Sequence, residues 1–391
     1  MRWNKLIITI IFFILAAGSC IEPFVPETSD YVNTMFIEAI VSDHADIPHK
    51  VVISRTVPIH TQENINTTPD TPSDNISGAN VTIHCDDGTF YQFNETGIGK
   101  YFDTGGNLTL EEGKQYKIVI ETLEGNLYES PFEKFVPSPP IDSITHKTLN
   151  AKLTETSDAS LGLGFYANTR MQGSEPLYVR YLMEETYLYG VPFFSAYIWD
   201  GSKLVEFLND SIAYCYKTGN VSGIYVSTSE GLSENRVRNA PLHFVSQYGD
   251  KLMIKYSLFA CQMSINKSAY RFWEELSRLL FETGGLYETQ PFRISGNITC
   301  TSNPGINVMG VFEVAGVSTT RIFVPHPRDF RVYPEFCSRD TVGVESFPWE
   351  NVEVGAYITE DDPGVFMTGD PRCFDCRERG GVIERPPFWQ K

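Results

Sequence analysis

The sequence predicts a mainly β protein, with an N-terminal immunoglobulin-like β-sandwich followed by a larger β-rich domain that carries one prominent α-helix. Three observations lead to this prediction. Short segments alternate between apolar and polar residues, and turn-forming residues separate them. Aromatic residues, which favour strands, make up 13% of the chain. Only residues 266–283 have the apolar spacing of a long amphipathic helix.

The predicted sandwich covers residues 34–135. Its clearest strand is residues 79–85, in which Val81, Ile83 and Cys85 alternate with polar side chains. We therefore expect Cys85 to lie in a core. Several such segments within about 100 residues are typical of an immunoglobulin-like sandwich.

A proline-rich segment, residues 136–140, predicts a stiff connector and the boundary between the two domains. The second domain then covers residues 141–391, where further alternating segments predict strands around the helix. From about Phe336 onward the sequence favours loops over regular elements.

The predicted helix begins at Asn266, a suitable N-cap, and stops at Gly284 and Gly285. One side of it carries an apolar stripe formed by Tyr270, Trp273, Leu276 and Leu280. A single helix amid strands packs such a stripe across a sheet. We therefore expect Trp273 to be a buried structural aromatic.

The chain is acidic, with 49 acidic against 31 basic residues and a formal charge of -18. Nucleic acids and anionic lipid headgroups bind clustered lysine and arginine side chains. The charge balance therefore argues against both classes of partner, and it fits an acidic, solvated surface.

Residues 1–19 predict a lipoprotein signal peptide. A short basic start precedes an apolar run, residues 6–17, that is too short to cross a bilayer as a helix. Small residues then precede Cys20, although Ala17 stands where leucine is usual. We expect cleavage before Cys20, acylation of its thiol, and a lipidated tether over residues 20–33. The alternative is an ordinary secretory cleavage that leaves a free thiol.

Two or more acyl chains suffice for stable membrane attachment. The signal therefore predicts an exported bacterial protein, tethered to a membrane, whose folded part lies in the periplasm or outside the cell. Beyond the signal, no apolar run of the sequence is long enough to span a bilayer.

With Cys20 assigned to lipid, the remaining cysteines are odd in number, so at most three disulfides can form. Only Cys373 and Cys376 lie close in sequence, and the second CxxC that a structural zinc site needs is absent. Structural disulfides are therefore favoured over metal or redox chemistry.

The C-terminal tail is rich in glycine and proline, yet it carries Phe388 and Trp389, and large aromatics are rarely left loose. We expect the tail to dock on the second domain with Trp389 in an apolar groove. The candidate disulfides that pin it join Cys373 or Cys376 to Cys337 or Cys215.

The chain has no HExxH, GxSxG, P-loop or Rossmann pattern, so no catalytic residue, metal or cofactor is assigned. His44 and His49 stand near aspartates, but an exposed turn is favoured over a metal site. Residues 360–364 resemble part of a calcium loop without its ligand spacing, which favours a solvated turn. A pair of carboxylates for glycoside hydrolysis, contributed by distant strands, stays open.

An ordered set of short segments runs along the chain: Cys20–Phe24, Phe36–Asp43, Cys215-Tyr216, Ala269–Trp273, Gln290–Asn297, Gly310–Phe312, Cys373–Cys376, Gly380-Gly381 and Arg385–Trp389. Together they resemble a family of Bacteroidota lipoproteins, the domain-of-unknown-function family 4249. The resemblance covers essentially the whole chain after the signal. Cys85, Cys261 and Cys300 are not part of the family pattern, so it implies nothing about their pairing.

The resemblance implies a non-enzymatic lipoprotein of the outer membrane, facing the cell surface rather than the periplasm. It also implies a role as an accessory or ligand-capturing subunit of a TonB-dependent nutrient transporter. An envelope structural or adhesion protein is the alternative, and a hydrolase with an unrecognised carboxylate pair is a second one. The sequence names no ligand.

Three Asp-Ser/Thr-apolar triplets resemble the O-glycosylation acceptor of exported Bacteroidota proteins. They make Ser143, Ser211 and Thr341 candidate modification sites. Because the triplet is short, chance matches are expected.

Overall fold

The computed structural model describes residues 34–55, 75–152, 158–207, 210–282, 294, 296–342 and 352–389. The expected signal peptide, the tether with its lipidation site Cys20, and the glycines expected to stop the helix lie outside these residues. None of the helices within them is long and apolar enough to cross a membrane.

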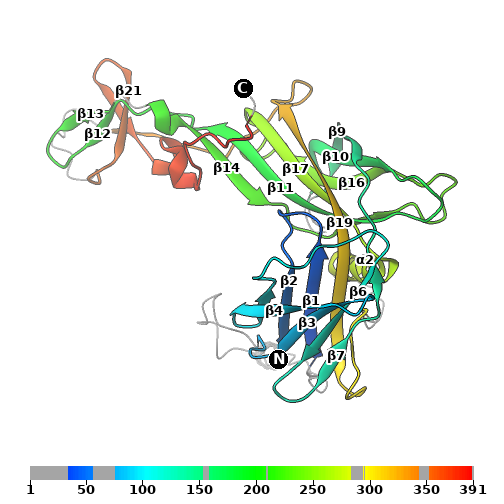
Figure 1. Cartoon of the computed structure of the whole chain (residues 1–391). Coiled ribbons are helices and arrows are strands. Elements are labelled where there is room, and N and C mark those ends of the chain that lie inside the picture. Colours follow the sequence, from blue (N-terminus) through cyan, green and yellow to red (C-terminus); the bar gives the residue numbers. More distant parts are fainter. Residues whose placement is uncertain are drawn as a thin grey trace, which may run out of the picture.

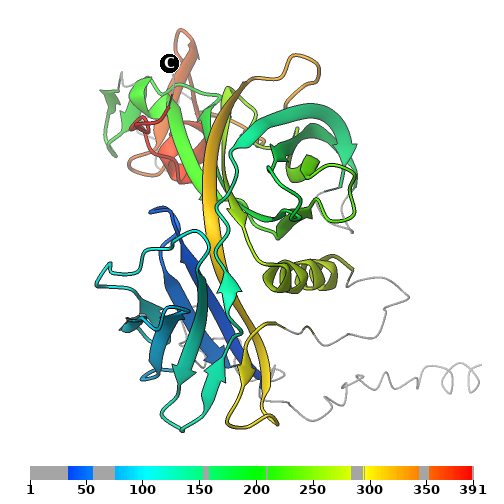
Figure 2. The same ribbon diagram turned by 45° about the vertical axis from the view of Figure 1, so that its right-hand side comes forward.

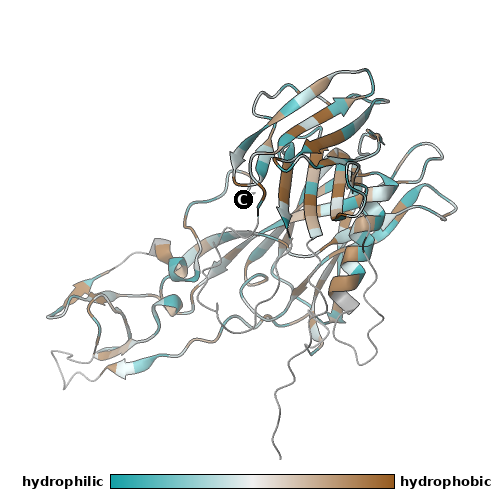
Figure 3. Ribbon diagram, turned by 90° about the horizontal axis from the view of Figure 1, so that it is seen from below, coloured by the Kyte–Doolittle hydropathy of each residue, from teal (hydrophilic) through white to brown (hydrophobic). Residues whose placement is uncertain are grey.

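The protein is mainly β, as expected, and α2 (Lys267–Glu282) is the one α-helix among the described residues. The strands form a 14-stranded, a 3-stranded and a 5-stranded sheet. Figure 3 shows apolar and polar residues alternating along many of these strands. Alternation places one set of side chains in a core and the other in solvent.

The N-terminal body contains the first eight strands and one strand from much later in the chain. Val81, Ile83 and Cys85 are buried in its core, as the alternation predicts. The immunoglobulin-like arrangement itself stays a prediction. The strands are β1 (Thr34–Ser42), β2 (Lys50–Arg55), β3 (Asn80–Cys85), β4 (Phe90–Gly97), β5 (Lys100–Phe102), β6 (Gln115–Glu121), β7 (Leu127–Glu129), β8 (Glu133–Lys134) and β18 (Thr299–Cys300).

The second body is built around β11 and β17, which a separate sheet of order β16-β10-β9 covers on one face. The large side chains of the core between them include Phe165, Tyr181 and Tyr256, all buried. Its strands are β9 (Ile141–Ala151), β10 (Ser160–Arg170), β11 (Tyr178–Gly190), β14 (Tyr214–Asn220), β15 (Tyr225–Thr228), β16 (Arg236–Ser246) and β17 (Lys255–Ser264).

One long strand, β19 (Asn307–Pro325), joins the two bodies (Figures 1 and 2). Its first half pairs in parallel with β1, and its second half pairs antiparallel with β17. The division of the sheets therefore differs from the expected boundary, which assigned every residue after 140 to the second domain. Strand β18 and half of β19 complete the N-terminal sheet instead, because long-range pairing is invisible to a search for linkers.

The proline-rich segment 136–140 is packed against the middle of β19. A side chain at Gly316 would meet the carbonyl oxygen of Val136 at 2.4 Å. The Gln262 amide donates to Ser138 Oγ at 3.1 Å and to the Pro139 carbonyl at 2.9 Å. The segment expected to be a connector is therefore fixed to both β17 and β19.

A small sheet of order β13-β12-β21-β22-β20 projects from the second body (Figure 1). Two distant parts of the chain form it around buried Trp199 and Ile358. The loops expected after Phe336 are therefore wrong for three segments, because β21 pairs with β12 far earlier in the chain (Tyr197 opposite Ile358) and β22 and β20 extend the sheet from it. The strands are β12 (Tyr197–Trp199), β13 (Leu204–Glu206), β20 (Asp340–Val342), β21 (Tyr357–Asp362) and β22 (Val365–Thr368).

Helix α2 packs at the junction between the two bodies (Figure 2). Trp273 is buried as expected, but Leu280 is 60% exposed, so the predicted stripe is wrong at its end. The buried face centres on Ala269, Phe272 and Trp273. Leu276 and Leu279 further along the helix are only partly buried against the same cluster, and Leu280 is exposed, so the packing of the helix loosens toward its end.

Candidate functional site

A cleft of about 750 Å³ opens where β11, β14, the β16–β17 connection and the C-terminal segment meet. Its volume falls in the range of small-molecule sites, roughly 300–1,000 Å³. Aromatic and charged side chains alternate around it. The tyrosines that line it are Tyr187, Tyr189, Tyr248 and Tyr333.

Two of these tyrosines stack on each other and remain exposed. The ring centroids of Tyr248 and Tyr333 lie 5.5 Å apart, and the side chains are 62% and 43% exposed. The backbone fixes the pair, because Tyr333 N–H donates to the Gln247 carbonyl and Gly249 N–H donates to the Tyr333 carbonyl, each at 2.8 Å. The Arg331 guanidinium lies 5.2 Å from the Tyr333 ring centroid. The cleft thus presents a preformed aromatic surface.

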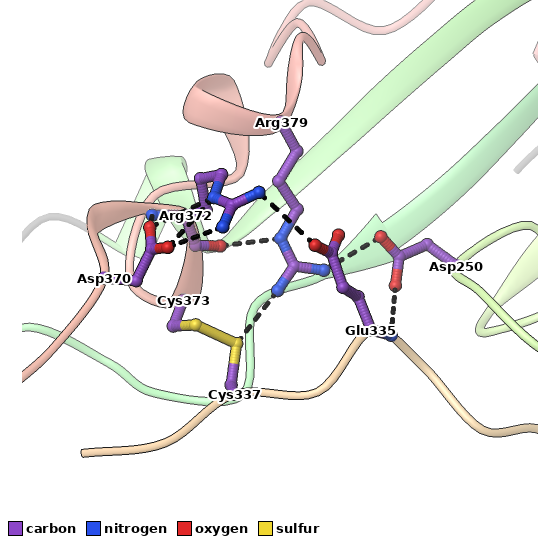
Figure 4. The surroundings of a disulfide bond; sticks show 7 residues. All are labelled: Asp250, Glu335, Cys337, Asp370, Arg372, Cys373 and Arg379. Atoms are coloured by element: carbon purple, nitrogen blue, oxygen red, sulfur yellow. Dashed lines mark hydrogen bonds and ion pairs between the residues drawn. A yellow bond between two sulfur atoms is a disulfide. The ribbon is translucent and has the colours of Figure 1, made fainter. Parts of the chain in front are cut away.

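A network of ion pairs also lines the cleft (Figure 4). Arg379 Nη1 donates to Asp250 Oδ2 at 2.8 Å, and both side chains are nearly buried. Asp250 Oδ1 also accepts from the backbone N–H of Glu335 at 3.4 Å. Arg372 pairs with Asp370 at 2.7 Å and with Glu335 at 3.4 Å. The charged groups of this network are therefore held in fixed, mutually neutralising positions.

A buried acid organises the lysine at the side of the cleft. Glu185 accepts hydrogen bonds from Lys251 and, at 2.9 Å, from the Tyr256 hydroxyl, and His243 Nε2 lies 3.5 Å away. Burial raises the pKa of Glu185, but the hydrogen bonds and charges of His243 and Lys251 outweigh it, so the pKa lies below its usual range. An ionised Glu185 therefore holds Lys251 in place.

Two disulfides fix the C-terminal wall to the rest of the second body. Cys215 of β14 joins Cys376, and Cys337 joins Cys373. These are the four cysteines that the sequence offers as candidates. Arg379 Nη2 also donates to Cys337 Sγ at 3.1 Å, so the wall, the disulfide and the ion pairs are one unit (Figure 4).

The C-terminal wall consists of two short 3-10 helices, each of which contains one disulfide-bonded cysteine. They are η3 (Pro371–Cys373) and η4 (Cys376–Arg379). Asp370 and Asp375 cap them by accepting from Arg372 N–H and Arg377 N–H. At Gly381 a side chain would meet Tyr189 Oη at 2.5 Å, so glycine is required where the segment crosses β11 and β14.

The tail beyond this wall docks as the sequence predicts. Val382 exchanges two backbone hydrogen bonds with Tyr216 of β14. Trp389 is 5% exposed and packs edge-to-face on Tyr216 at 5.1 Å and on Phe323 at 5.4 Å. Phe388 is 38% exposed, and the Arg321 guanidinium lies 3.6 Å from its ring centroid. Trp389 is thus the buried anchor, whereas Phe388 is partly exposed.

The remaining cysteines of the described chain, Cys85, Cys261 and Cys300, are free and buried. Burial raises the pKa of the Cys261 thiol to about 12, and it also raises that of Cys85. Since the thiolate is the reactive form, these two thiols are structural.

The other candidate positions do not line the cleft. Ser143 on β9 and Thr341 on β20 are exposed, the side chain of Ser211 lies outside the described residues, and modification at all three stays a prediction. His49 bonds backbone atoms of Ser42 and Leu108, which makes it part of a turn. No group of three or more potential ligands in the described ranges is placed to hold a metal ion.

The tyrosines and charged residues of the cleft are absent from the sequence-based candidates. They come from positions 187–189, 217, 248–251, 333–335 and 372–379, and no local motif connects them. Three arginines, Arg372, Arg377 and Arg379, stand close in sequence, but Asp370, Asp375 and Glu378 balance their charge, so this segment gives no signal that points to the site.

Comparison with known proteins identifies a family but no characterised relative. Residues 21–321 match a domain of unknown function, DUF4249. No curated protein and no solved structure matches the chain. The match covers most of the chain and includes β1 to β18 and the first part of β19. The chain therefore belongs to the DUF4249 family, as its ordered segments predicted.

Proposed function

We propose that this protein is a non-enzymatic outer-membrane lipoprotein that captures a ligand in its tyrosine-lined cleft. It would act as an accessory subunit of a TonB-dependent nutrient transporter and face the cell surface. The observation that carries the binding role is the cleft itself, which exposed stacked aromatics and a network of ion pairs both line. Preorganised polar and aromatic walls are typical of binding sites.

The position of the cleft suits capture by a tethered protein. Strand β19 begins opposite Thr34, the first described residue after the proposed tether, and ends opposite Lys255 beside the cleft. At about 3.3 Å per residue, its 19 residues span roughly 60 Å. A lipid at Cys20 would therefore attach on the side of β1, while β11 and β14, which contribute to the cleft, lie toward the other end of β19 (Figure 1).

The charged groups of the cleft favour binding over hydrolysis. A glycoside hydrolase needs one carboxyl group that donates a proton and a second that acts as base or nucleophile. Three carboxylates line the cleft, and Asp250 and Glu335 are each engaged by an arginine, which leaves Glu378 without a second free carboxylate beside it in the described lining. Such pairing holds the two carboxylates in place for hydrogen bonding.

The transporter role is tested by reversible crosslinking and purification of the full-length protein from its own host, with Cys20→Ser and Ser19→Ala as variants. Wild type and Ser19→Ala, which keeps a small residue before the cysteine, are expected to fractionate with the outer membrane and enrich a TonB-dependent transporter. Cys20→Ser is expected to become soluble, because its acyl chains are lost.

Enrichment of surface polymers or adhesion proteins without a transporter would replace the proposal with the structural alternative. Retention of Cys20→Ser in the membrane after a high-salt wash would contradict lipid anchoring, unless a tightly bound partner holds it.

A further inference from the structure

We infer that the ligand of the cleft is a neutral oligosaccharide. The inference rests on the proposed ligand-capturing function and names its ligand class. Three features of the cleft carry it: the exposed tyrosine pair, the internal pairing of most of its charges, and its size.

The tyrosine pair provides a stacking surface. Tyr248 is backed by Tyr333 on one face and is more than half exposed, so its outer face is open to a ligand. Sugar rings present faces of C–H groups that pack against aromatic rings. Tyrosine supplies this contact with little loss of conformational freedom and adds a hydroxyl for hydrogen bonding.

Most charges of the cleft are already engaged. The Lys217 ammonium donates to the Arg379 carbonyl at 2.6 Å, and among the carboxylates of the described lining residues only that of the exposed Glu378 has no ion pair. Arg379 with Asp250, Arg372 with Glu335, and Lys251 with buried Glu185 each form an ion pair. An anion or a cation would have to compete with these partners. Hydroxyl groups can instead donate to the carboxylates and accept from the guanidinium groups without breaking any pair.

The size and the overall charge point the same way. A cleft of about 750 Å³ accommodates a ligand of several rings rather than a single small metabolite. The whole chain carries a formal charge of -18, so an anionic ligand would approach against a repulsive field. An uncharged, polyhydroxylated chain neither competes with the existing ion pairs nor is repelled by the negative charge of the protein.

The test is titration calorimetry on the full-length acylated protein, solubilised in a detergent without a sugar headgroup. The neutral probes are maltohexaose, mannohexaose and xylohexaose. The charged probes are hexagalacturonate and a glucosamine hexamer, and an uncharged hexapeptide completes the set. We expect at least one neutral probe to bind, with an affinity that changes little between low and high salt.

The variants locate the binding. Tyr248→Ala is expected to weaken binding by about tenfold or more, because the stacking surface is removed. Tyr248→Phe keeps the ring and is expected to stay within about threefold of the wild type. Phe90→Ala removes an exposed aromatic on β4, away from the cleft, and is expected to leave affinity unchanged. Unchanged melting temperatures in all three establish that the effect is local.

The inference is overturned if no neutral probe binds, if only a charged probe or the peptide binds, or if Tyr248→Ala leaves neutral-probe affinity intact. A charged probe lost in Tyr248→Ala would keep the cleft as the ligand site and discard the saccharide class. Since the assay contains no transporter, its failure leaves the transporter test unaffected, and failure of that test leaves this one standing.

Discussion

Beneath α2, where the two bodies meet, Glu313 is completely buried, whereas beside the cleft Glu185 is buried but holds a lysine that reaches the surface. Glu313 accepts from Arg180 Nη1 at 2.6 Å and from Trp273 Nε1 at 2.8 Å. The Arg180 guanidinium also lies 3.6 Å from the Trp273 ring centroid. Both of these partners of Glu313, which lies on β19, are internal, and they come from β11 and α2.

The comparison distinguishes a structural network from a network suited to a ligand. In the junction, the charged groups, the aromatic ring and the hydrogen-bonding groups all interact with one another inside the protein. Removing one partner therefore leaves a buried charge without its counterpart. In the cleft, the same types of side chain are paired, yet tyrosine faces and arginine edges remain exposed. Aromatic and arginine side chains therefore mark a binding site here only where they stay accessible.

The pKa shifts of the two regions also run in opposite directions. Burial raises the pKa of Glu313, although Arg180 and Trp273 oppose the shift. Burial likewise raises the pKa of Glu133, which accepts from Ser268 at 2.6 Å and from Asn297 at 2.8 Å in the same junction. The pKa of Glu185 is lowered by its basic neighbours.

The largest expected effect is on the junction. Trp273→Ala is expected to cost about 3–5 kcal/mol, because a buried aromatic is lost and Glu313 loses a hydrogen-bond donor. Chemical denaturation measures it. Leu280→Ala on the same helix is the control and is expected to change stability by about 0.5 kcal/mol or less, since that side chain is exposed. Equal effects of the two variants would contradict the observed packing of α2.

The next effect is on the cleft wall. Replacing Cys215 and Cys376 together by serine is expected to cost about 2–5 kcal/mol, because this bridge closes a loop of 161 residues. The pair Cys337 and Cys373 closes 36 residues and is expected to cost less by the same entropy argument. Both double variants are expected to weaken ligand binding. If the variants lose stability but keep full ligand affinity, the C-terminal wall is not part of the ligand site.

The pH dependence is expected to differ in sign between the regions. Glu185, whose pKa is lowered, stabilises the fold above its ordinary pKa of 4.5, and this contribution is lost as pH falls through the folded pKa. Glu133, whose pKa is raised, contributes stability below pH 4.5 that is lost as pH rises through its folded pKa.

Melting temperatures measured from pH 3 to 8 test this difference. Relative to the wild type, Glu185→Gln is expected to lose stability near neutral pH and to converge with it in acid. Glu133→Gln keeps an acceptor oxygen and is expected to gain most near neutral pH. Parallel curves for both variants would contradict the opposite shifts.

The smallest effect on stability is expected at the exposed rim of the cleft. Arg372→Ala removes a surface ion pair and is expected to leave the melting temperature unchanged. Ligand affinity is nevertheless expected to fall, because a donor of the cleft wall is lost. Arg238→Ala, which breaks an exposed pair with Glu234 elsewhere, is the matched control. Equal affinities in the two variants would exclude Arg372 from the site.

Local patterns in the sequence predicted the features that depend on neighbouring residues. Period-two alternation placed Cys85 in a core, and helical spacing located α2 and its buried Trp273. Composition alone singled out the aromatic tail that docks through Trp389. These features are local because side-chain direction repeats every two residues in a strand and every 3.6 in a helix.

Only the tertiary structure decided the features that depend on distant partners. The pair Arg180–Glu313 spans 133 residues, and the stacked Tyr248 and Tyr333 belong to separate connections. Strand β19 joins two bodies because one half pairs with β1 and the other with β17, a choice that alternation within β19 does not encode. The sequence by itself determined which faces are apolar and which segments form elements. Which faces meet, and therefore where the cleft lies, followed from long-range pairing, because hydrogen-bonded partners and buried charges are selected by the whole fold.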